Sequence, residues 1–400
     1  MKIAIIGGGA SGLMAGGFLT DQGHLVTIFD GNEKCGKKLF ITGKGRCNVT
    51  NNCSEEEYLS NVVHGNKFMF SSIRGFNCQD TMSFFEEKGV KLKTERGNRV
   101  FPESDKSSDI IKALVNHCKG CDFVLNEKVE NIYKDGEKFV VSSQNGKYQF
   151  DRVIISTGGK SYAGTGSKGD GYKFAKQFGH KIISLRPALV PIRLQDRFCA
   201  GLEGLSLKNV ELKAEFDNKT KKMFGEMLFT SDAISGPIAL SLSSFISDAQ
   251  NLSLSLDFKP ALSAEQLEAR ILRDFSNNLN KNLSYIIKGL LPLRLVDVFL
   301  KKIEISSTTK VNSVTVEQRK KIVENLKNFK LTYDGLYPIE TGIVIAGGVD
   351  TKEVNPKTME SKICQGLYFI GEVLDVDCLT GGFNLQTAFS TAYACAKYMN

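Results

Sequence analysis

Residues 1–30 read MKIAIIGGGASGLMAGGFLTDQGHLVTIFD. A short apolar run precedes the glycines of Gly7-x-Gly9-x-x-Gly12, a helical segment follows them, and a second apolar run ends at Asp30. This order of strand, glycine loop, helix, strand and acid is that of a βαβ unit that binds a dinucleotide. The stretch therefore predicts a nucleotide-binding fold.

Each part of this motif has a physical role in holding a dinucleotide. Gly7 permits a tight turn, Gly9 lets the backbone approach a pyrophosphate, and Gly12 allows the helix to pack closely on the strand. The helix N-terminus offers unpaired N–H groups and a partial positive charge to the phosphates. Asp30 lies where a carboxylate accepts hydrogen bonds from a ribose diol, and its charge disfavours a 2′-phosphate. The alternative is a tight glycine turn without a ligand.

Length and composition are those of an ordinary globular chain. Its 400 residues exceed what one hydrophobic core usually organises, so we expect two or three domains. Lys plus Arg total 52 against 44 Asp plus Glu, and the net charge of +8 is spread without a block of like charges. We therefore expect a small-molecule substrate and no nucleic-acid partner. No apolar run has membrane-spanning length and no signal peptide precedes the first strand, which predicts a cytoplasmic protein without membrane contact.

The ten cysteines and four histidines are scattered through the sequence. Cys118 and Cys121 have the spacing of a redox or metal motif, but no second pair or histidine lies at zinc-site distance. We expect reduced thiols and no metal site.

The order of predicted elements indicates one nucleotide-binding domain that is interrupted by a second domain. Alternating runs with turn signals predict a β meander between about 123 and 150, and a buried strand at 152–156 returns to the first sheet. The predicted domains are 1–189 (cofactor domain), 190–337 (β-rich insert) and 338–400 (return of the cofactor domain). Further predicted strands lie at 3–6, 26–29, 210–216, 252–258 and 366–370, and predicted helices at 81–88, 264–275, 316–326 and 385–398. The nucleotide-fold pattern resumes at 342–349.

Two further glycine motifs do not support additional nucleotide sites. Gly164-x-Gly166-x-x-Gly169 does not directly follow a strand, and the P-loop-like segment 31–37 lacks the Ser or Thr that would hold magnesium. One large dinucleotide in an interrupted domain favours non-covalent FAD as the resident cofactor. NAD(P)H would then bind only transiently.

Several longer motifs resemble a known family. Along nearly its whole length the chain resembles the bacterial FAD-dependent oxidoreductases that include aminoacetone oxidase and the BaiN-type bile-acid reductases, the YhiN-like flavoproteins. The motifs are IIGGGASGLMAG near the start, GKKLFITGKGRCNVTN at 36–51, GNRVFPES at 97–104, STGGKSYAGTGSKGDGY at 156–172, GEMLFTSDAISGP at 225–237, AGGVDTKEVNPKTMESK at 346–362 and GLYFIGEVLDVDCLTGGFNLQTAFS at 366–390. The resemblance implies an α/β fold with a Rossmann-like FAD domain of the glutathione-reductase type and a β-rich insert.

The resemblance also implies a set of FAD-binding residues. They fall into four groups: the pyrophosphate loop with the ribose acid, the segment that lies along the cofactor, the second segment that crosses the cofactor, and the C-terminal flavin contact. Val129 is a further predicted FAD-binding residue. In that order they are Gly7, Gly9, Ala10, Ser11, Gly12 and Asp30; Lys38, Gly43, Arg46, Cys47 and Asn48; Thr157, Gly158 and Gly159; and Gly371, Glu372, Gly382, Asn384, Leu385 and Gln386. The predicted helix after Gly382 supports the last group, because its positive end can face the flavin edge where negative charge develops.

The leading hypothesis is hydride transfer between flavin N5 and a small organic substrate held between the FAD domain and the insert. Two half-reactions stay open: oxidation of a small amine, or NAD(P)H-dependent reduction of an enone. Tyr162 is the predicted proton donor and Arg46 the predicted anchor for an anionic group. The alternatives are an NAD-dependent dehydrogenase without flavin and a non-catalytic flavin-binding protein. The sequence predicts no particular oligomeric state.

Overall fold

The computed structural model describes residues 1–399, which form two compact units. The first contains Met1–Ala188 and the chain from Ile339 onwards, and the second contains Leu189–Pro338. A parallel sheet with helices forms the centre of the first unit, and an antiparallel sheet forms the centre of the second. The predicted α/β fold class, with a Rossmann-type sheet and a separate β-rich region, is confirmed.

Five parallel strands form the centre of the first unit. Their order is β21-β11-β1-β2-β7, and Ile3 and Ile5 of the central strand are completely buried. Because every pairing is parallel, the carboxyl ends of the strands lie at one edge of the sheet. The strands are β1 (Lys2–Ile6), β2 (Leu25–Phe29), β7 (Asp122–Val124), β11 (Arg152–Ile155) and β21 (Leu367–Phe369). They confirm the strands predicted at 3–6, 26–29, 152–156 and 366–370.

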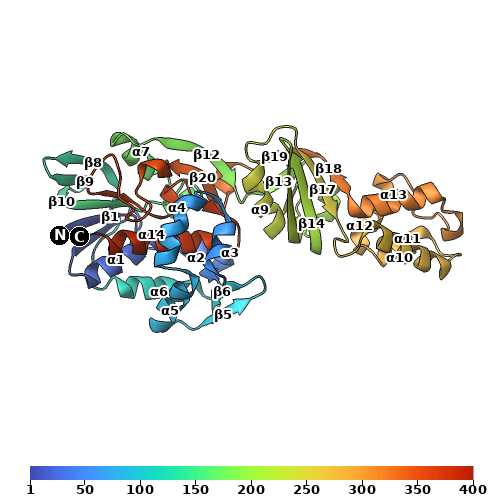
Figure 1. Cartoon of the computed structure of the whole chain (residues 1–400), viewed down its shortest axis with the longest axis horizontal. Helices are drawn as coiled ribbons and strands as arrows, with labels where there is room; N and C mark the ends of the chain where they lie inside the picture. The colour runs from blue at the N-terminus through green and yellow to red at the C-terminus, as the bar shows by residue number, and fades with distance from the viewer. Residues whose placement is uncertain (400) are drawn as a thin grey trace. The chain divides into compact units, whose positions relative to one another are not determined.

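Two helices from opposite ends of the chain lie side by side in this unit. They are α1 (Ala10–Asp21) and α14 (Phe383–Lys397), which Figure 1 shows in blue and red. Leu13, Met14 and Leu19 bury the inner face of α1, and α14 is buried along most of its length. The C-terminal helix predicted at 385–398 is therefore confirmed. It packs against α1, from the N-terminal part of the chain.

Short helices surround the central sheet. The segment Ser54-x-x-Glu57 forms a capping box at the start of α3, with Ser54 Oγ accepting the N–H of Glu57 at 3.2 Å. The helices are α2 (Lys37–Ile41), α3 (Glu55–Ser60), α4 (Asn66–Gly75), α5 (Cys78–Glu87), α6 (Ser107–His117) and α7 (Asp170–Gln177).

Antiparallel strands complete the first unit. The predicted meander is confirmed as β8 (Val129–Asp135), β9 (Lys138–Ser143) and β10 (Lys147–Phe150). Three smaller sheets pair distant segments: β3-β6-β5, β22-β4 and β12-β20. Their strands are β3 (Thr50–Asn51), β4 (Val62–His64), β5 (Leu92–Glu95), β6 (Arg99–Pro102), β12 (Ile182–Ala188), β20 (Val344–Val349) and β22 (Asp377–Cys378).

The second unit is built on a seven-stranded antiparallel sheet of order β18-β17-β14-β15-β16-β13-β19. Leu212, Met227 and Phe229 are among its fully buried side chains. The strands are β13 (Ile192–Leu194), β14 (Ser206–Phe216), β15 (Lys219–Phe229), β16 (Ala233–Ser235), β17 (Ser253–Asp257), β18 (Phe329–Leu331) and β19 (Tyr333–Leu336). The sheet contains the strands predicted at 210–216 and 252–258.

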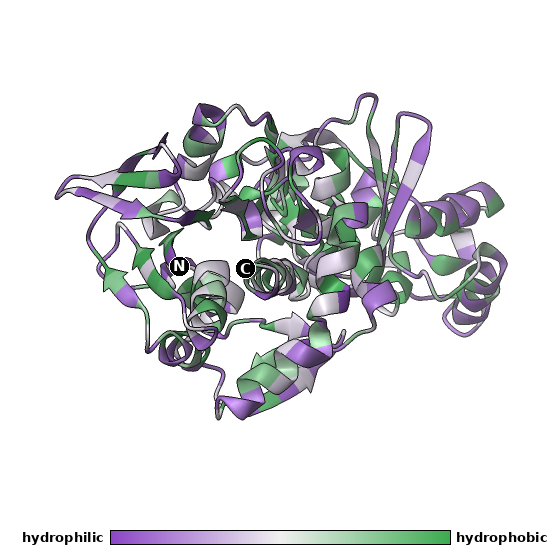
Figure 2. Cartoon of the chain, turned by 60° about the vertical axis from the view of Figure 1, so that its left-hand side comes forward, coloured by the Kyte–Doolittle hydropathy of each residue, from purple (hydrophilic) through white to green (hydrophobic). Residues whose placement is uncertain are grey.

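Helices make up the rest of the second unit, which is therefore not only β-structure. Those predicted at 264–275 and 316–326 are confirmed, and capping boxes at Ser263 and Thr315 start them. Figure 2 shows mostly hydrophilic residues, in purple, on the helices at its right. The helices are α8 (Phe198–Leu202), α9 (Pro237–Ile246), α10 (Ala264–Ser276), α11 (Leu283–Lys288), α12 (Leu293–Lys302) and α13 (Val316–Lys327).

Three further properties concern residues 1–399. In this range no helix is both long and apolar enough to cross a membrane. Within the same residues, no group of three or more His, Cys, Asp or Glu side chains is arranged to hold a metal ion. All ten cysteines are free thiols.

Candidate functional site

The glycine loop between β1 and α1 leaves backbone amides uncovered. A Cβ on Gly12 would lie 2.0 Å from the carbonyl oxygen of Gly7, so only glycine permits this approach of helix to strand. A Cβ on Gly9, in contrast, would meet no atom within 4 Å. Among residues 1–399 no side chain caps α1, which begins with Ala10 and Ser11. The amides there could bind an anionic pyrophosphate.

Asp30, at the end of β2, holds this glycine loop. Its Oδ2 accepts the N–H of Gly8 at 2.9 Å, and its Oδ1 accepts the backbone and side-chain N–H groups of Asn32, also at 2.9 Å. Its carbonyl accepts the N–H of Glu127 at 3.1 Å, which brings the nearby buried Val129 into the same region. Because a carboxylate has about four acceptor positions, half-buried Asp30 retains capacity for a ribose hydroxyl.

Lys38 and Glu372 join distant parts of the predicted site. Lys38 Nζ lies 2.6 Å from both Glu372 Oε2 and Ser161 Oγ, and Ser161 Oγ also lies 3.3 Å from Glu372 Oε1. A Cβ on Gly158 or Gly159 would lie 3.7 or 3.0 Å from the same carboxylate. The ion pair therefore fixes α2 and the loops after β11 and β21 against one another.

The loops after β1, β11 and β21 meet at the carboxyl edge of the sheet. Ser156 Oγ donates to the carbonyls of Ile6 and Gly7 at 3.1 and 2.9 Å. A Cβ on Gly371 would lie 2.6 Å from Ser11 Oγ, so this loop also touches the first turn of α1. Ligands of open α/β sheets bind at this edge.

The start of α14 is a second uncapped helix terminus in the predicted site. Gly382 has φ +99°, and a Cβ there would lie 2.3 Å from the Thr50 carbonyl oxygen, so the position requires glycine. Asn384 binds the preceding loop: it accepts the N–H of Cys378 at 3.0 Å and donates to its carbonyl at 2.9 Å. Leu385 is half-buried, and no side chain among residues 1–399 caps the helix. Its positive end could face the electron-rich edge of a flavin.

Gln386 is fully buried, and its amide is used inside the protein. Its Oε1 accepts the hydroxyls of Thr50 and Thr81 at 2.6 and 2.8 Å. Its Nε2 donates to the Phe76 carbonyl and to Ser390 Oγ at 3.1 and 3.0 Å. These four bonds use the capacity of the side chain. The structure therefore places Gln386 in the core and does not bring its amide to the other predicted residues.

The segment after α2 contains a buried acceptor without a partner. Asn48 Oδ1 is buried and has no hydrogen-bond partner among residues 1–399, and the same holds for Thr157 Oγ1. A Cβ on Gly43 would lie 3.2 Å from the Asn48 nitrogen. Because buried polar atoms are nearly always hydrogen-bonded, both atoms fit contact with a bound cofactor. Cys47 is completely buried, which raises the pKa of its thiol to about 12 and keeps it protonated.

Arg46 is the predicted anchor for an anion, yet two carboxylates already bind its guanidinium. Its Nη2 forms ion pairs with Glu95 and, at 2.6 Å, with Asp105. Its Cζ lies 4.2 Å from the ring centroid of Phe101. Hydrogen bonds to Glu95 and Asp105 raise the pKa of Arg46 further. Its charge is therefore balanced within the protein.

Tyr162 lies in a loop that borders the region of Asp30. The side chain is 38% exposed, and the backbone has φ +53°. The carbonyl of Thr165 in the same loop accepts the side-chain N–H of Asn32 at 3.1 Å, and Asn32 in turn binds Asp30. The loop that contains Tyr162 is thus joined through Asn32 to Asp30, the predicted ribose-binding residue.

His64 and Asp377 form an ion pair that the sequence did not predict, and Asp377 lies shortly before α14 in the chain. His64 Nδ1 is 2.5 Å from Asp377 Oδ1, and the hydrogen bond to this fully buried carboxylate raises the pKa of His64. Asp377 Oδ2 and Asp375 Oδ1 are buried without a hydrogen-bond partner among residues 1–399. Because Asn384 binds Cys378, the pair adjoins the first turn of α14. The available signal was two acids within the otherwise apolar stretch VLDVDC.

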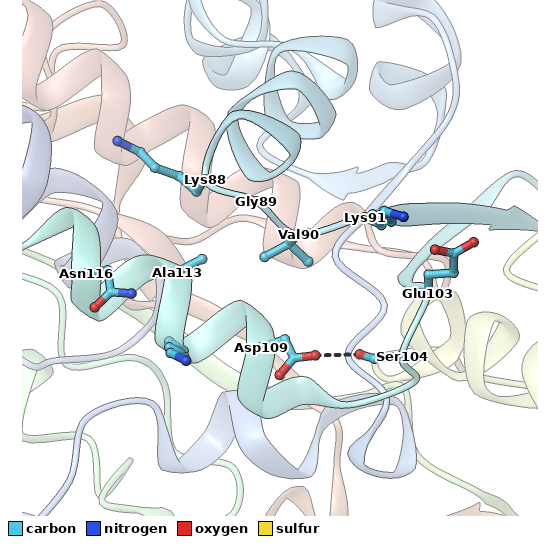
Figure 3. Close-up of a pocket in the computed structure, with 10 residues that line it drawn as sticks. Lys88, Gly89, Val90, Lys91, Glu103, Ser104, Asp109, Ala113 and Asn116 are labelled. Atoms are coloured by element: carbon cyan, nitrogen blue, oxygen red, sulfur yellow. Dashed lines mark hydrogen bonds between the residues drawn. The ribbon is translucent and has the colours of Figure 1, made fainter.

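A separate hollow of the first unit contains none of the predicted residues. Figure 3 shows it between the end of α5, the strand after it and α6, with Ser104 Oγ donating to Asp109 Oδ2 at 2.6 Å. Both lysines and acids line it, so it has no dominant charge. Its lining residues are Lys88, Gly89, Val90, Lys91, Glu103, Ser104, Asp109, Lys112, Ala113 and Asn116.

The glycine loop, Asp30 and the uncapped start of α1 are the features that the sequence predicts for a dinucleotide site. A family model described as the HI0933-like protein Rossmann domain matches residues 1–398, so the chain belongs to this family. The resemblance drawn from its motifs is confirmed, and the chain is an FAD-dependent oxidoreductase. This class replaces both alternatives considered for the sequence.

Particular relatives cover nearly the whole chain. It is 33% identical over 401 residues to the ribosomal RNA dihydrouridine synthase of Haemophilus influenzae, covering 98% of this chain and 96% of that protein. It is 29% identical over 411 residues to the 3-dehydro-bile acid delta(4,6)-reductase of Clostridium scindens, covering 99% and 98%. The solved 3-ketosteroid delta1-dehydrogenase of Sterolibacterium denitrificans shares its fold, with a TM-score of 0.52 at 12% identity over 99% of this chain and 98% of that one.

The Haemophilus relative corrects one expectation. Its name states that it acts on ribosomal RNA, so the prediction that nucleic acid plays no part is wrong. That prediction depended on the modest total charge and on the lack of a continuous basic block. Neither property describes basic residues that the fold gathers from separate segments.

Alanine at the two loop glycines should separate folding from cofactor binding. Gly12→Ala forces a contact with the Gly7 carbonyl, and such overpacking costs about 1–3 kcal/mol of unfolding free energy. Gly9→Ala has open space and a φ of −84°, so we expect an unchanged Tm but less bound FAD. Calorimetry and the flavin absorbance per protein measure the two effects. Full FAD content in Gly9→Ala would contradict a pyrophosphate site at this loop.

The His64–Asp377 pair should make stability depend on pH. Because the folded pKa of His64 is raised above its ordinary value of 6.5, its contribution is complete below about pH 6.5 and is lost as pH rises through the folded pKa. Nearby Arg186 opposes this shift and Asp375 supports it. We expect His64→Gln to cost about 1–3 kcal/mol at pH 6 and less at pH 9, measured by urea unfolding. His24→Gln is the matched control, and an equal loss at both pH values would refute the charged pair.

Proposed function

We propose that this chain reduces uridine in ribosomal RNA to dihydrouridine, with non-covalently bound FAD and with NAD(P)H as the hydride source. The main support is 33% identity along 98% of the chain to a protein that carries this activity in its name. The second relative is named a 3-dehydro-bile acid delta(4,6)-reductase. Both names favour the reductase half of the sequence hypothesis over amine oxidation.

The two named reactions share one type of chemistry. The C5–C6 double bond of uracil is conjugated to the C4 carbonyl, as an enone is. Hydride addition at C6 and protonation at C5 give dihydrouridine, while NAD(P)H becomes NAD(P)⁺ and one proton is taken up. FAD, when bound, supplies the hydride relay between the two molecules.

The residues of the first unit are suited to hold FAD by its polar ends. The uncapped amides of α1 would bind the pyrophosphate, Asp30 the ribose, and the positive end of α14 the flavin edge. Asn48 and Thr157 offer their partnerless oxygens along the cofactor. The protonated thiol of Cys47 is a poor nucleophile, which supports a non-covalent cofactor.

His64 is better placed than Tyr162 to donate the proton. Its Nδ1 is bound to Asp377, which orients the ring and leaves Nε2 to deliver a proton. Its raised pKa keeps the ring charged at higher pH, and it adjoins the start of α14, where the flavin would lie. Tyr162, by contrast, belongs to the loop whose Thr165 carbonyl binds Asn32, near Asp30.

Direct detection of the product tests the proposed reaction. Ribosomal RNA that lacks dihydrouridine is incubated anaerobically with the purified protein and NADPH or NADH, then digested and analysed by mass spectrometry. We expect a nucleoside two mass units heavier than uridine, and bleaching of the flavin by NAD(P)H. Bleaching by a small amine alone, with no dihydrouridine, would overturn the proposal in favour of an oxidase.

Separate substitution of His64 and Tyr162, the two candidate proton donors, tests the role of His64. We expect His64→Gln to lower the single-turnover rate of uridine reduction about 100-fold, as loss of a general acid does. Flavin reduction by NAD(P)H should keep its rate, because that step needs no proton from His64. Tyr162→Phe should retain the wild-type rate, with Tyr133→Phe as a control of similar exposure. The reverse ranking of His64→Gln and Tyr162→Phe would restore Tyr162 as the donor.

A further inference from the structure

Two stretches of the second unit contain basic residues but no acid. Residues 275–296 carry Lys281, Lys288 and Arg294, and residues 305–316 carry Lys310. Neither stretch contains Asp or Glu, although acids border each of them. Residues 297–304, which include the C-terminal part of α12, separate the two stretches in the sequence.

The fold places these two stretches against each other. The N–H of Val311 donates to the Lys281 carbonyl at 3.0 Å, and the N–H of Leu283 donates to the Thr309 carbonyl at 2.8 Å. Asn282 and Lys310 form an isolated antiparallel bridge. Lys281 and Lys310 therefore lie on neighbouring segments at the start of α11, whereas Arg294 is bound to the carbonyls of Gly201 and Glu203.

An exposed aromatic ring lies on α11. The Tyr285 side chain is 55% exposed, and Lys281 Nζ lies 5.6 Å from its ring centroid. The opposite face of α11 buries Leu283, Ile286 and Ile287, so the helix does not need the tyrosine for packing. Its exposure leaves a flat apolar surface next to positive charge. We call Lys281, Tyr285, Lys288 and Lys310 the Tyr285 patch.

The positive charges of the Tyr285 patch are not neutralised by neighbouring carboxylates. Lys310 Nζ donates to the Asn280 carbonyl at 3.2 Å, and none of the patch lysines forms an ion pair with a carboxylate among residues 1–399. Some other lysines of the unit do pair with acids, as Lys222 does with Glu211 at 2.9 Å. The patch is therefore a local site of positive potential despite the modest total charge.

We infer that the Tyr285 patch binds single-stranded RNA, with its lysines on the phosphates and a base stacked on Tyr285. Lysines without a carboxylate partner beside an exposed ring are how proteins hold unstacked nucleotides. The inference rests on the proposed function, because it assigns the RNA substrate a docking surface. A duplex offers no free base face for the ring, so the single-stranded form is favoured.

Binding of a fluorescein-labelled single-stranded fragment of ribosomal RNA to the full-length holoprotein tests the patch. Fluorescence anisotropy is measured over a salt series for the wild type and for K281A/K288A/K310A. We expect weaker binding by the triple variant, and a slope of log K against log salt that is smaller by about 2. Tyr285→Ala should weaken binding on the order of 10-fold with an unchanged slope.

Matched variants separate recognition from charge loss or misfolding. K119A/K147A/K176A removes three exposed lysines from the first unit and should bind as the wild type does. Tyr285→Phe keeps the ring and should retain the affinity, as should K281R/K288R/K310R, which keeps the three positive charges. Equal weakening by both lysine triplets, or tighter binding of polyglutamate than of RNA, would overturn the inference.

Catalysis gives a readout that distinguishes failure of the patch from failure of the proposed reaction. If dihydrouridine forms, K281A/K288A/K310A should raise KM for RNA and leave flavin reduction by NAD(P)H unchanged. An unchanged KM in this variant would refute RNA binding by the patch and leave the proposed reaction standing. RNA binding that depends on the patch without any dihydrouridine would support the patch and refute the reaction.

Discussion

The close approach of α1 to the backbone of Gly7 is the contact on which the candidate site depends. Because no side chain intervenes at Gly12, the first turn of the helix reaches the carboxyl end of β1. Ser11 on that turn then meets the loop after β21, while Ser156 fastens the loop after β11 to the same backbone. A Cβ at Gly12 would push apart three loops that come from distant parts of the chain.

The elements that the sequence predicted are those whose signals are local. The buried strands, the meander and the capping box at Ser54 are each encoded within a few residues. Side-chain roles were harder to predict because their partners are far away in the chain. Gln386 is held by Thr50 and Thr81, more than 300 residues earlier. No local sequence pattern shows that these bonds occupy every donor and acceptor position of the Gln386 amide.

The same limit explains the error about nucleic acid. Total charge and continuous basic blocks are properties of the linear chain, whereas a binding surface is a property of the fold. The acid-free stretches 275–296 and 305–316 become significant only when the bonds between them place them side by side. Tyr285 likewise reads as an ordinary helical aromatic until its exposure is known.

The buried carboxylate of Asp377 connects stability with the proposed proton transfer. An ionised carboxylate that is removed from water needs a partner, and His64 provides it in its charged form. Proton donation to a substrate would leave Asp377 buried beside a neutral ring, which is the less stable state. Uptake of a new proton by His64 is therefore favoured, and its side chain is 32% exposed to the solvent that supplies it. A donor held in this way returns to its charged form after each turnover without any change in the fold.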